Sequence, residues 1–115
     1  MSRNVDKKTR LLMERIGIKV RRIMEMRNMT QNDLAEAVGY ASNAMVNHLV
    51  NGRRLPSMHK IEEIAHVLGI PVGYLMDEHD YSKKDLQIII AMHDTILNKD
   101  ERPLYNALAA MFGIK

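Results

Sequence analysis

The sequence contains no cysteine and no tryptophan, and only 4% of its 115 residues are aromatic. The absence of cysteine excludes a disulfide framework and thiolate metal sites. A core formed by this chain must therefore consist of aliphatic and methionine side chains. The longest apolar runs, such as 88–92, span only a few residues, and the N-terminus lacks the apolar stretch of a signal peptide. We expect a soluble cytoplasmic protein without membrane contact, folded as one domain with a short appendage.

Signatures of catalysis are also missing from the sequence. It has no Gly-rich phosphate loop and no Gly-x-Ser-x-Gly nucleophile motif. The five histidines do not show metal-site spacing, because His59 and His66 stand two helical turns apart. We therefore expect no catalytic residue, no metal and no cofactor, and a function other than that of an enzyme.

Charge is distributed unevenly along the chain, although the net charge is only +3. Residues 1–54 contain 11 Lys and Arg and 5 Asp and Glu, whereas residues 55–115 contain 6 and 9. The first half is therefore basic and the second half acidic. This asymmetry favours an anionic partner for the first half, although the charge of a small basic domain can also serve solubility alone.

Helical periodicity dominates the sequence, and strand-type alternation is nearly absent, which predicts an all-α fold. The first helix is expected over about 7–26, with Leu12, Ile16, Val20 and Ile23 as its apolar stripe and Lys19 off that stripe. Because glycine weakens a helix, Gly17 also allows a start near residue 16. Six more helices are expected: 31–38, 43–50, one between Ser57 and Gly69, a short one after Pro71, one after Ser82, and 101–112.

Two of these helices, 31–38 and 43–50, are short and separated by a tight turn. Thr30 and Asp33 form a capping-box pattern at the start of the first, and Gly39 ends it. Ser42 is a good N-cap for the second helix, whose Met45, Val46 and Leu49 face one side. Two helices of this kind, the second with polar residues on its outer face, make a helix-turn-helix arrangement.

Four stretches of the sequence, 16–23, 30–39, 51–57 and 64–71, resemble the Cro/cI-type helix-turn-helix domain of phage repressors and related bacterial regulators, also described as the xenobiotic-response-element type. The resemblance implies a five-helix DNA-binding domain over 16–77. The distance from Gly39 to Gly52 is one residue longer than the family's usual spacing. We place the extra residue in the turn, at Tyr40 or Ala41, because Val46 and Leu49 then keep the family's buried positions.

The resemblance also implies roles for individual residues. Asn43, Ala44 and His48 match base-facing positions, and Asn47 lies beside them on the same face. Backbone contacts are implied for Gln31, Ser42, Arg53 and Arg54. An asparagine can pair with adenine, a histidine can donate to guanine, and an alanine can touch a thymine methyl. For each of these residues, the alternative interpretation is an ordinary solvated side chain.

Residues 1–15 are expected to form an N-terminal arm or an extension of the first helix. Their basic residues are Arg3, Lys7, Lys8 and Arg10. Two interpretations remain open: the segment reaches the DNA minor groove or backbone, or it extends the first helix and packs on a partner subunit.

Residues 82–115 are expected to form a two-helix segment whose apolar stripes need a partner for burial. We predict dimerisation through Leu86, Ile89, Ile90, Leu104, Leu108 and Phe112. A homodimer can read two half-sites of an inverted-repeat operator about one DNA turn apart. The alternative is that the segment caps a monomeric domain.

The predicted function is that of a dimeric, sequence-specific repressor of phage or bacterial origin that binds double-stranded DNA and occludes a promoter. The C-terminal segment is too short for a self-cleaving peptidase domain, so release would require another route, such as an antirepressor protein. The alternative function is that of an antitoxin-like protein. In that case the C-terminal helices would bind a toxin, and DNA binding would regulate the protein's own operon.

Overall fold

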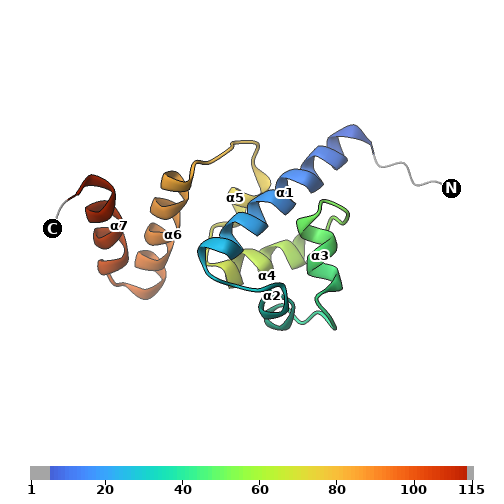
Figure 1. Cartoon of the computed structure of the whole chain (residues 1–115), viewed down its shortest axis with the longest axis horizontal. Helices are drawn as coiled ribbons and strands as arrows, with labels where there is room; N and C mark the ends of the chain where they lie inside the picture. The colour runs from blue at the N-terminus through green and yellow to red at the C-terminus, as the bar shows by residue number, and fades with distance from the viewer. Residues whose placement is uncertain (1–5, 114–115) are drawn as a thin grey trace.

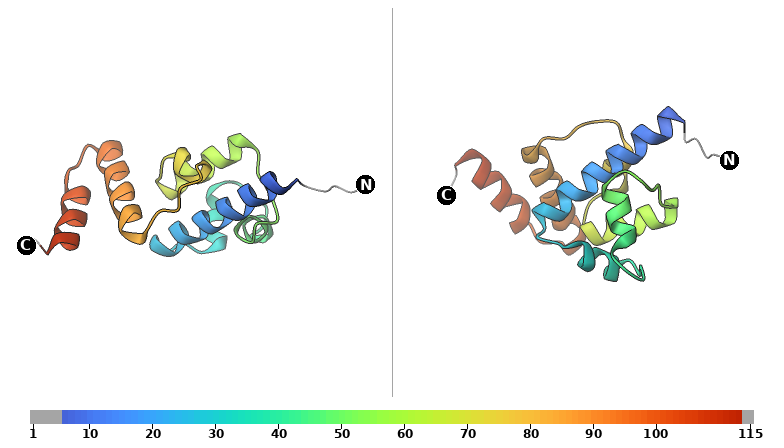
Figure 2. Two further views of the ribbon diagram at one scale, coloured as in Figure 1. Left: turned by 90° about the horizontal axis from the view of Figure 1, so that it is seen from above. Right: turned by 45° about the vertical axis from the view of Figure 1, so that its right-hand side comes forward.

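The computed structural model describes residues 6–113, which contain seven α-helices and no strand (Figure 1). This confirms the predicted all-α class. Five helices surround one core, and the last two form a hairpin at one end of an elongated molecule of 59 × 29 × 20 Å (Figures 1 and 2). The helices are α1 (Lys7–Met26), α2 (Gln31–Ala37), α3 (Ala44–Val50), α4 (Met58–Leu68), α5 (Val72–Met76), α6 (Lys83–Asn98) and α7 (Arg102–Phe112).

Helix α1 is continuous through Gly17, so the helix begins at Lys7 rather than near residue 16. Asp6 is its N-cap, and the Asp6 carboxylate accepts a hydrogen bond from the Thr9 amide at 2.8 Å. Arg3 of the predicted arm lies outside the described residues. The division of the chain at residues 15 and 82 stays a prediction.

Side-chain caps begin the helices where the sequence predicted them. The Thr30 hydroxyl accepts from the Asp33 amide at 3.0 Å, and the Asp33 carboxylate accepts from the Thr30 amide at 2.9 Å. Ser82 and Asp85 form the same reciprocal pair at the start of α6. At α3 the Ser42 hydroxyl accepts from the Ala44 amide at 3.3 Å, and Asn43 already has helical geometry. The predicted start of α3 is therefore right to within one residue.

The core is aliphatic, as the composition required. Its side chains come from α1 to α5 and from the start of α6, and eleven large ones are almost completely buried. These are Ile16, Val20, Ile23, Leu34, Val46, Leu49, Ile64, Leu68, Ile70, Leu75 and Leu86.

Lys19 is buried inside the domain, although it lies off the apolar stripe of the sequence. It is 3% exposed, and its ammonium donates to the Tyr74 carbonyl at 2.7 Å and to the carbonyl and carboxylate of Asp77, both at 2.9 Å. All three donors of the ammonium are used, which offsets the loss of hydration. The rings of Tyr74 and Tyr81 lie 5.0 and 5.4 Å from the same nitrogen.

The carboxylate of Asp77 accepts hydrogen bonds from two side chains in this cluster and from the His79 amide at 3.2 Å. Tyr81 Oη donates to it at 2.6 Å, alongside Lys19. Burial works to raise the pKa of Asp77, but the hydrogen bonds from Tyr81 and Lys19 outweigh it and hold the pKa below its usual value. Burial also raises the pKa of Tyr74 to about 12, so the phenol stays neutral. The charge of Lys19 is therefore balanced by a single carboxylate.

Three further cations bind carbonyl oxygens at the C-terminal ends of other helices. Arg21 donates to the Val50 carbonyl of α3 at 3.5 Å and to Asn51 Oδ1 at 2.9 Å. Arg27 donates to the last carbonyl of α4, that of Leu68, at 2.9 Å. Lys60 donates to the Val38 carbonyl, at the end of α2, at 2.7 Å. With Lys19 at α5, a cation therefore donates to at least one carbonyl at the C-terminal end of each of α2 to α5.

Gly17 is the point at which α1 approaches α3 most closely. A β-carbon at this position would lie 2.5 Å from the Leu49 carbonyl oxygen and 3.0 Å from that of Val50. Both atoms belong to the backbone, so neither can move aside without shifting α3. Gly17 therefore lowers the helix propensity of α1 locally but permits the close contact that positions α3 against α1.

We predict that Gly17→Ala destabilises the protein by about 1–3 kcal/mol, because overpacking outweighs the gain in helix propensity of about 1 kcal/mol. Urea unfolding followed by circular dichroism measures the change. Gly73→Ala is the matched control: it lies in α5 with open space around the site, and it should leave stability unchanged or slightly raised. Equal stability of the two variants would contradict the close contact.

We predict that Lys19→Met lowers the free energy of unfolding by about 1.5–3 kcal/mol, because it removes hydrogen bonds made by a charged group. Methionine keeps most of the volume of lysine, so the loss of stability measures the contribution of the ammonium group rather than the cost of a cavity. Lys84→Met on the exposed face of α6 is the control and should leave the thermal midpoint unchanged. A wild-type midpoint for Lys19→Met would show that the buried ammonium adds nothing to stability.

Candidate nucleic-acid interface

Helix α3 divides sharply into a buried face and an exposed face. Val46 and Leu49 are completely buried against α1 and α2, and Val50 is 5% exposed. On the opposite side the predicted base-facing residues are all exposed: Asn43, Ala44, Asn47 and His48. The structure therefore brings these four side chains together on one small, mostly polar surface. A helix anchored on one side with such a surface on the other can approach base edges in a major groove.

The start of α2 lies beside this surface. Asn47 Nδ2 faces Gln31 Oε1 at 3.5 Å, a long hydrogen bond between the first residue of α2 and the outer face of α3. Gln31 is partly buried, whereas Ser42 in the intervening turn is exposed. Both side chains contact α3, Ser42 through the Ala44 amide and Gln31 through Asn47.

The turn between α2 and α3 is fixed by backbone and side-chain contacts, and Val46 and Leu49 of α3 are completely buried. Gly39 has a positive φ of 79°, and the Tyr40 amide donates to the Ala35 carbonyl at 2.9 Å. Lys60 lies 5.0 Å from the centre of the Tyr40 ring while it binds the Val38 carbonyl. Lys60 of α4 therefore fixes the turn through its contacts with Val38 and Tyr40, whereas Ala41 is exposed.

The loop after α3 carries Arg53 and Arg54, both of which are exposed. The Arg53 amide donates to the His48 carbonyl at 2.8 Å, which fixes the loop to the end of α3. Gly52 lies against α1, because a β-carbon there would be 3.1 Å from the Cα of Glu14. Two cations thus lie at one end of the exposed face of α3, close to α1.

The comparison with known families agrees with this geometry. A family model described as "Helix-turn-helix" matches residues 20–75, from the middle of α1 to α5. This part of the chain is a helix-turn-helix domain of the Cro/cI type. No curated protein and no solved structure matches the chain. The predicted family is confirmed for this domain, and the match supports a DNA-binding transcriptional regulator.

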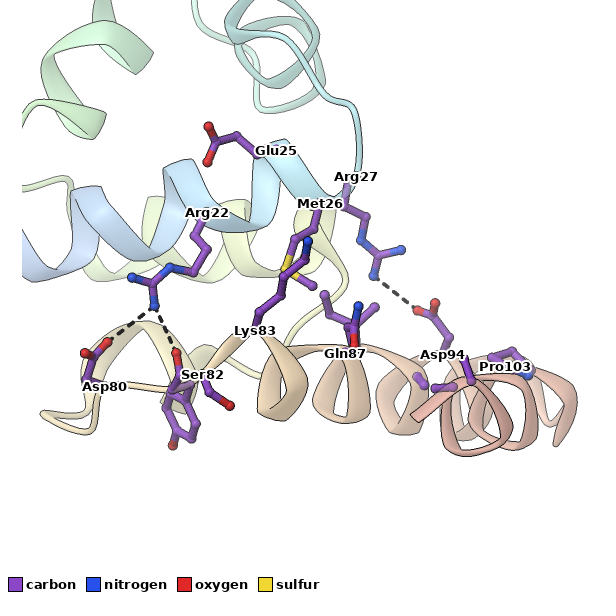
Figure 3. A pocket seen from close by; sticks show the side chains of 15 residues that line it. Arg22, Glu25, Met26, Arg27, Asp80, Ser82, Lys83, Gln87, Asp94 and Pro103 are labelled. Carbon is purple, nitrogen blue, oxygen red and sulfur yellow. Dashed lines mark hydrogen bonds and ion pairs between the residues drawn. The ribbon is translucent and has the colours of Figure 1, made fainter. Parts of the chain in front are cut away.

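Outside the helix-turn-helix domain, a groove of about 1080 Å³ lies between α1 and the α6–α7 hairpin (Figure 3). Its charged residues are largely paired across it. Arg22 binds Asp80 at 3.3 Å and the Tyr81 carbonyl at 3.0 Å, and Arg27 binds Asp94 at 3.3 Å. The groove therefore marks where the hairpin is tied to the domain by polar contacts.

The predicted dimerisation residues are placed unequally. Leu86, one of the residues predicted to take part in dimerisation, is completely buried in the core of its own chain and therefore presents no side-chain surface to a partner. Its position at the start of α6 brings it against the helix-turn-helix domain. Phe112 is 69% exposed, and the other predicted residues are partly buried: Ile89, Ile90, Leu104 and Leu108.

No group of three side chains suited to hold a metal ion lies within residues 6–113. None of the helices in the same range is long and apolar enough to cross a membrane.

The sequence did not reveal the residues that position α3 and its turn. Arg21 and Lys60 bind carbonyls 29 and 22 residues away, and no local pattern signals such pairs. Gly17 was visible in the sequence only as a weak point of a helix.

Proposed function

We propose that this chain binds operator DNA as a homodimer, with α3 in the major groove of each half-site, and represses transcription by covering a promoter. The observation that supports this most strongly is the division of α3. Two completely buried aliphatic side chains anchor one side, and four exposed, mostly polar side chains form the other. A helix of two turns presented in this way suits direct readout of base edges.

The proposed base contacts are made by Asn43, Ala44, Asn47 and His48. Asparagine pairs with adenine through two hydrogen bonds, histidine donates to guanine, and a small alanine permits contact with a thymine methyl. Gln31, Ser42, Arg53 and Arg54 are proposed to bind phosphates. Such contacts orient the protein without reading sequence.

The proposed homodimer forms through the exposed apolar side chains of the α6–α7 hairpin. Helix α7 has no buried residue, and its sequence is nevertheless rich in apolar residues. Exposed apolar surface of this extent is typical of an interface. A second copy is the occupant that suits an inverted repeat, because a two-fold axis then relates both the half-sites and the subunits. The exposed residues are Met92, Ile96, Leu97, Tyr105 and Phe112.

An antitoxin-like function is the second candidate, supported by the same surface. The α6–α7 hairpin carries four basic and four acidic residues, so its exposed apolar side chains, rather than its charge, suit a protein partner. The two candidates differ in what covers α6 and α7, so the oligomeric state of the purified chain distinguishes them.

Selection of duplexes from a random pool at about 0.15 M salt tests DNA recognition. We expect enrichment of an inverted repeat with half-sites about 10 base pairs apart. On that operator, Asn43→Ala and Asn47→Ala should each cost about 1–3 kcal/mol of binding free energy. Asn106→Ala, exposed on α7, is the control. Binding that shows no enrichment and only fades as salt rises would contradict specific recognition.

We predict that the double variant Ile96→Glu, Phe112→Glu raises the dimer dissociation constant by about a hundredfold or more. Burial of one such side chain is worth about 1.5–3 kcal/mol, and tenfold corresponds to about 1.4 kcal/mol. Sedimentation velocity measures the shift, and the thermal midpoint of the monomer should not fall, because both side chains are exposed. Ile18→Glu, at an exposed site on α1, is the control. A wild-type chain that stays monomeric at micromolar concentration would refute the homodimer and favour the protein-partner alternative.

A further inference from the structure

One face of α1 runs along the end of α3 and past the loop that follows it (Figure 2). The residues on this face recur every three or four positions, so they form a line along the helix. They are Lys7, Arg10, Glu14, Gly17 and Arg21.

The second half of this line is fixed by contacts. Gly17 touches the carbonyls of α3, and Arg21 binds Asn51 at the end of that helix. Glu14 packs against Gly52, the residue before the two loop arginines. The line therefore follows the end of α3 and then the loop from which Arg53 projects.

The residues in the first half of this line are exposed and do not pack against any other described element of the domain. Lys7 and Arg10 are exposed, and within residues 6–113 neither forms an ion pair. They lie on α1 beyond the point at which Glu14 meets the loop, on the same face of the helix. Because α1 is a continuous 20-residue helix capped by Asp6, these cations are held on a rigid element rather than on a mobile arm.

We propose that Lys7 and Arg10 bind DNA phosphates beyond those bound by Arg53 and Arg54, so that each subunit contacts backbone outside its half-site. This inference rests on the proposed binding of DNA through α3. Cations in line with the loop arginines fit a polyanion, and a phosphate contact needs no base pattern. Lys8 lies off this line, on a different face of the same helix, and takes no part.

The test measures operator affinity over a series of salt concentrations, on the duplex obtained by selection and extended at both ends. The logarithm of the binding constant falls with the logarithm of salt concentration by about 0.9 for each phosphate contact. We expect Lys7→Gln, Arg10→Gln to reduce this slope by about 1.8 for each half-site. The ranking of operator sequences should stay unchanged. Glutamine keeps a helix propensity close to that of lysine and arginine, so α1 remains folded.

A shortened duplex that ends at the half-sites gives a second measurement. On it, wild type and the double variant should show equal slopes, because the flanking phosphates are gone. Lys8→Gln on α1 and Lys84→Gln on α6 are matched controls for the lost charge, and each should leave the slope unchanged on both duplexes.

Equal slopes for wild type and the double variant on the long duplex would overturn this inference while leaving recognition by α3 intact. A changed oligomeric state without a changed slope would also overturn it, because α1 would then contact a second copy. If the wild-type chain selects no operator, the proposed function itself fails, and the two failures are therefore distinguishable.

Discussion

The close approach of α1 and α3 at Gly17 is the constraint on which the rest of the molecule depends. With only hydrogen atoms between the α1 backbone and two carbonyls of α3, the helices are fixed at their shortest separation. This contact buries Val46 and Leu49 and turns the opposite side of α3 outward. It also aligns the N-terminal turns of α1 with the loop after α3. The location of the proposed DNA-binding surface thus depends on the absence of a side chain at Gly17.

The polar residues of the domain extend this arrangement. Lys19 and Arg21 of α1 bind C-terminal carbonyls of α5 and α3, and Arg27, the residue after α1, binds that of α4. Lys60 of α4 does the same for α2. Short helices have a large share of unsatisfied terminal carbonyls, and a cation meets both their hydrogen-bonding need and the negative end of the helix dipole. In a domain of only five helices, α1 therefore contributes apolar side chains to the core and cations that cap the C-terminal ends of other helices.

The α6–α7 hairpin is held differently from the other helices. Leu86 enters the core, and the ion pairs of Arg22 and Arg27 tie the linker and α6 to α1, while α7 packs mainly on α6. Large apolar side chains consequently remain exposed on the hairpin, at the end of the molecule away from α3 (Figure 1). In the proposed homodimer, assembly and DNA recognition would therefore use different surfaces.

The sequence by itself determined the features that depend on near neighbours. The capping boxes at Thr30 and Ser82, the apolar spacing and the turn glycine Gly39 involve residues at most a few positions apart, and from them the helices and the family followed. Tertiary structure decided the rest. Lys19 can be buried because Tyr74 and Asp77, which lie 55 and 58 residues further along the chain, accept its hydrogen bonds. Leu86 is buried because the start of α6 packs against the core. Periodicity tells which side of a helix is apolar, but only packing in three dimensions decides what covers that side.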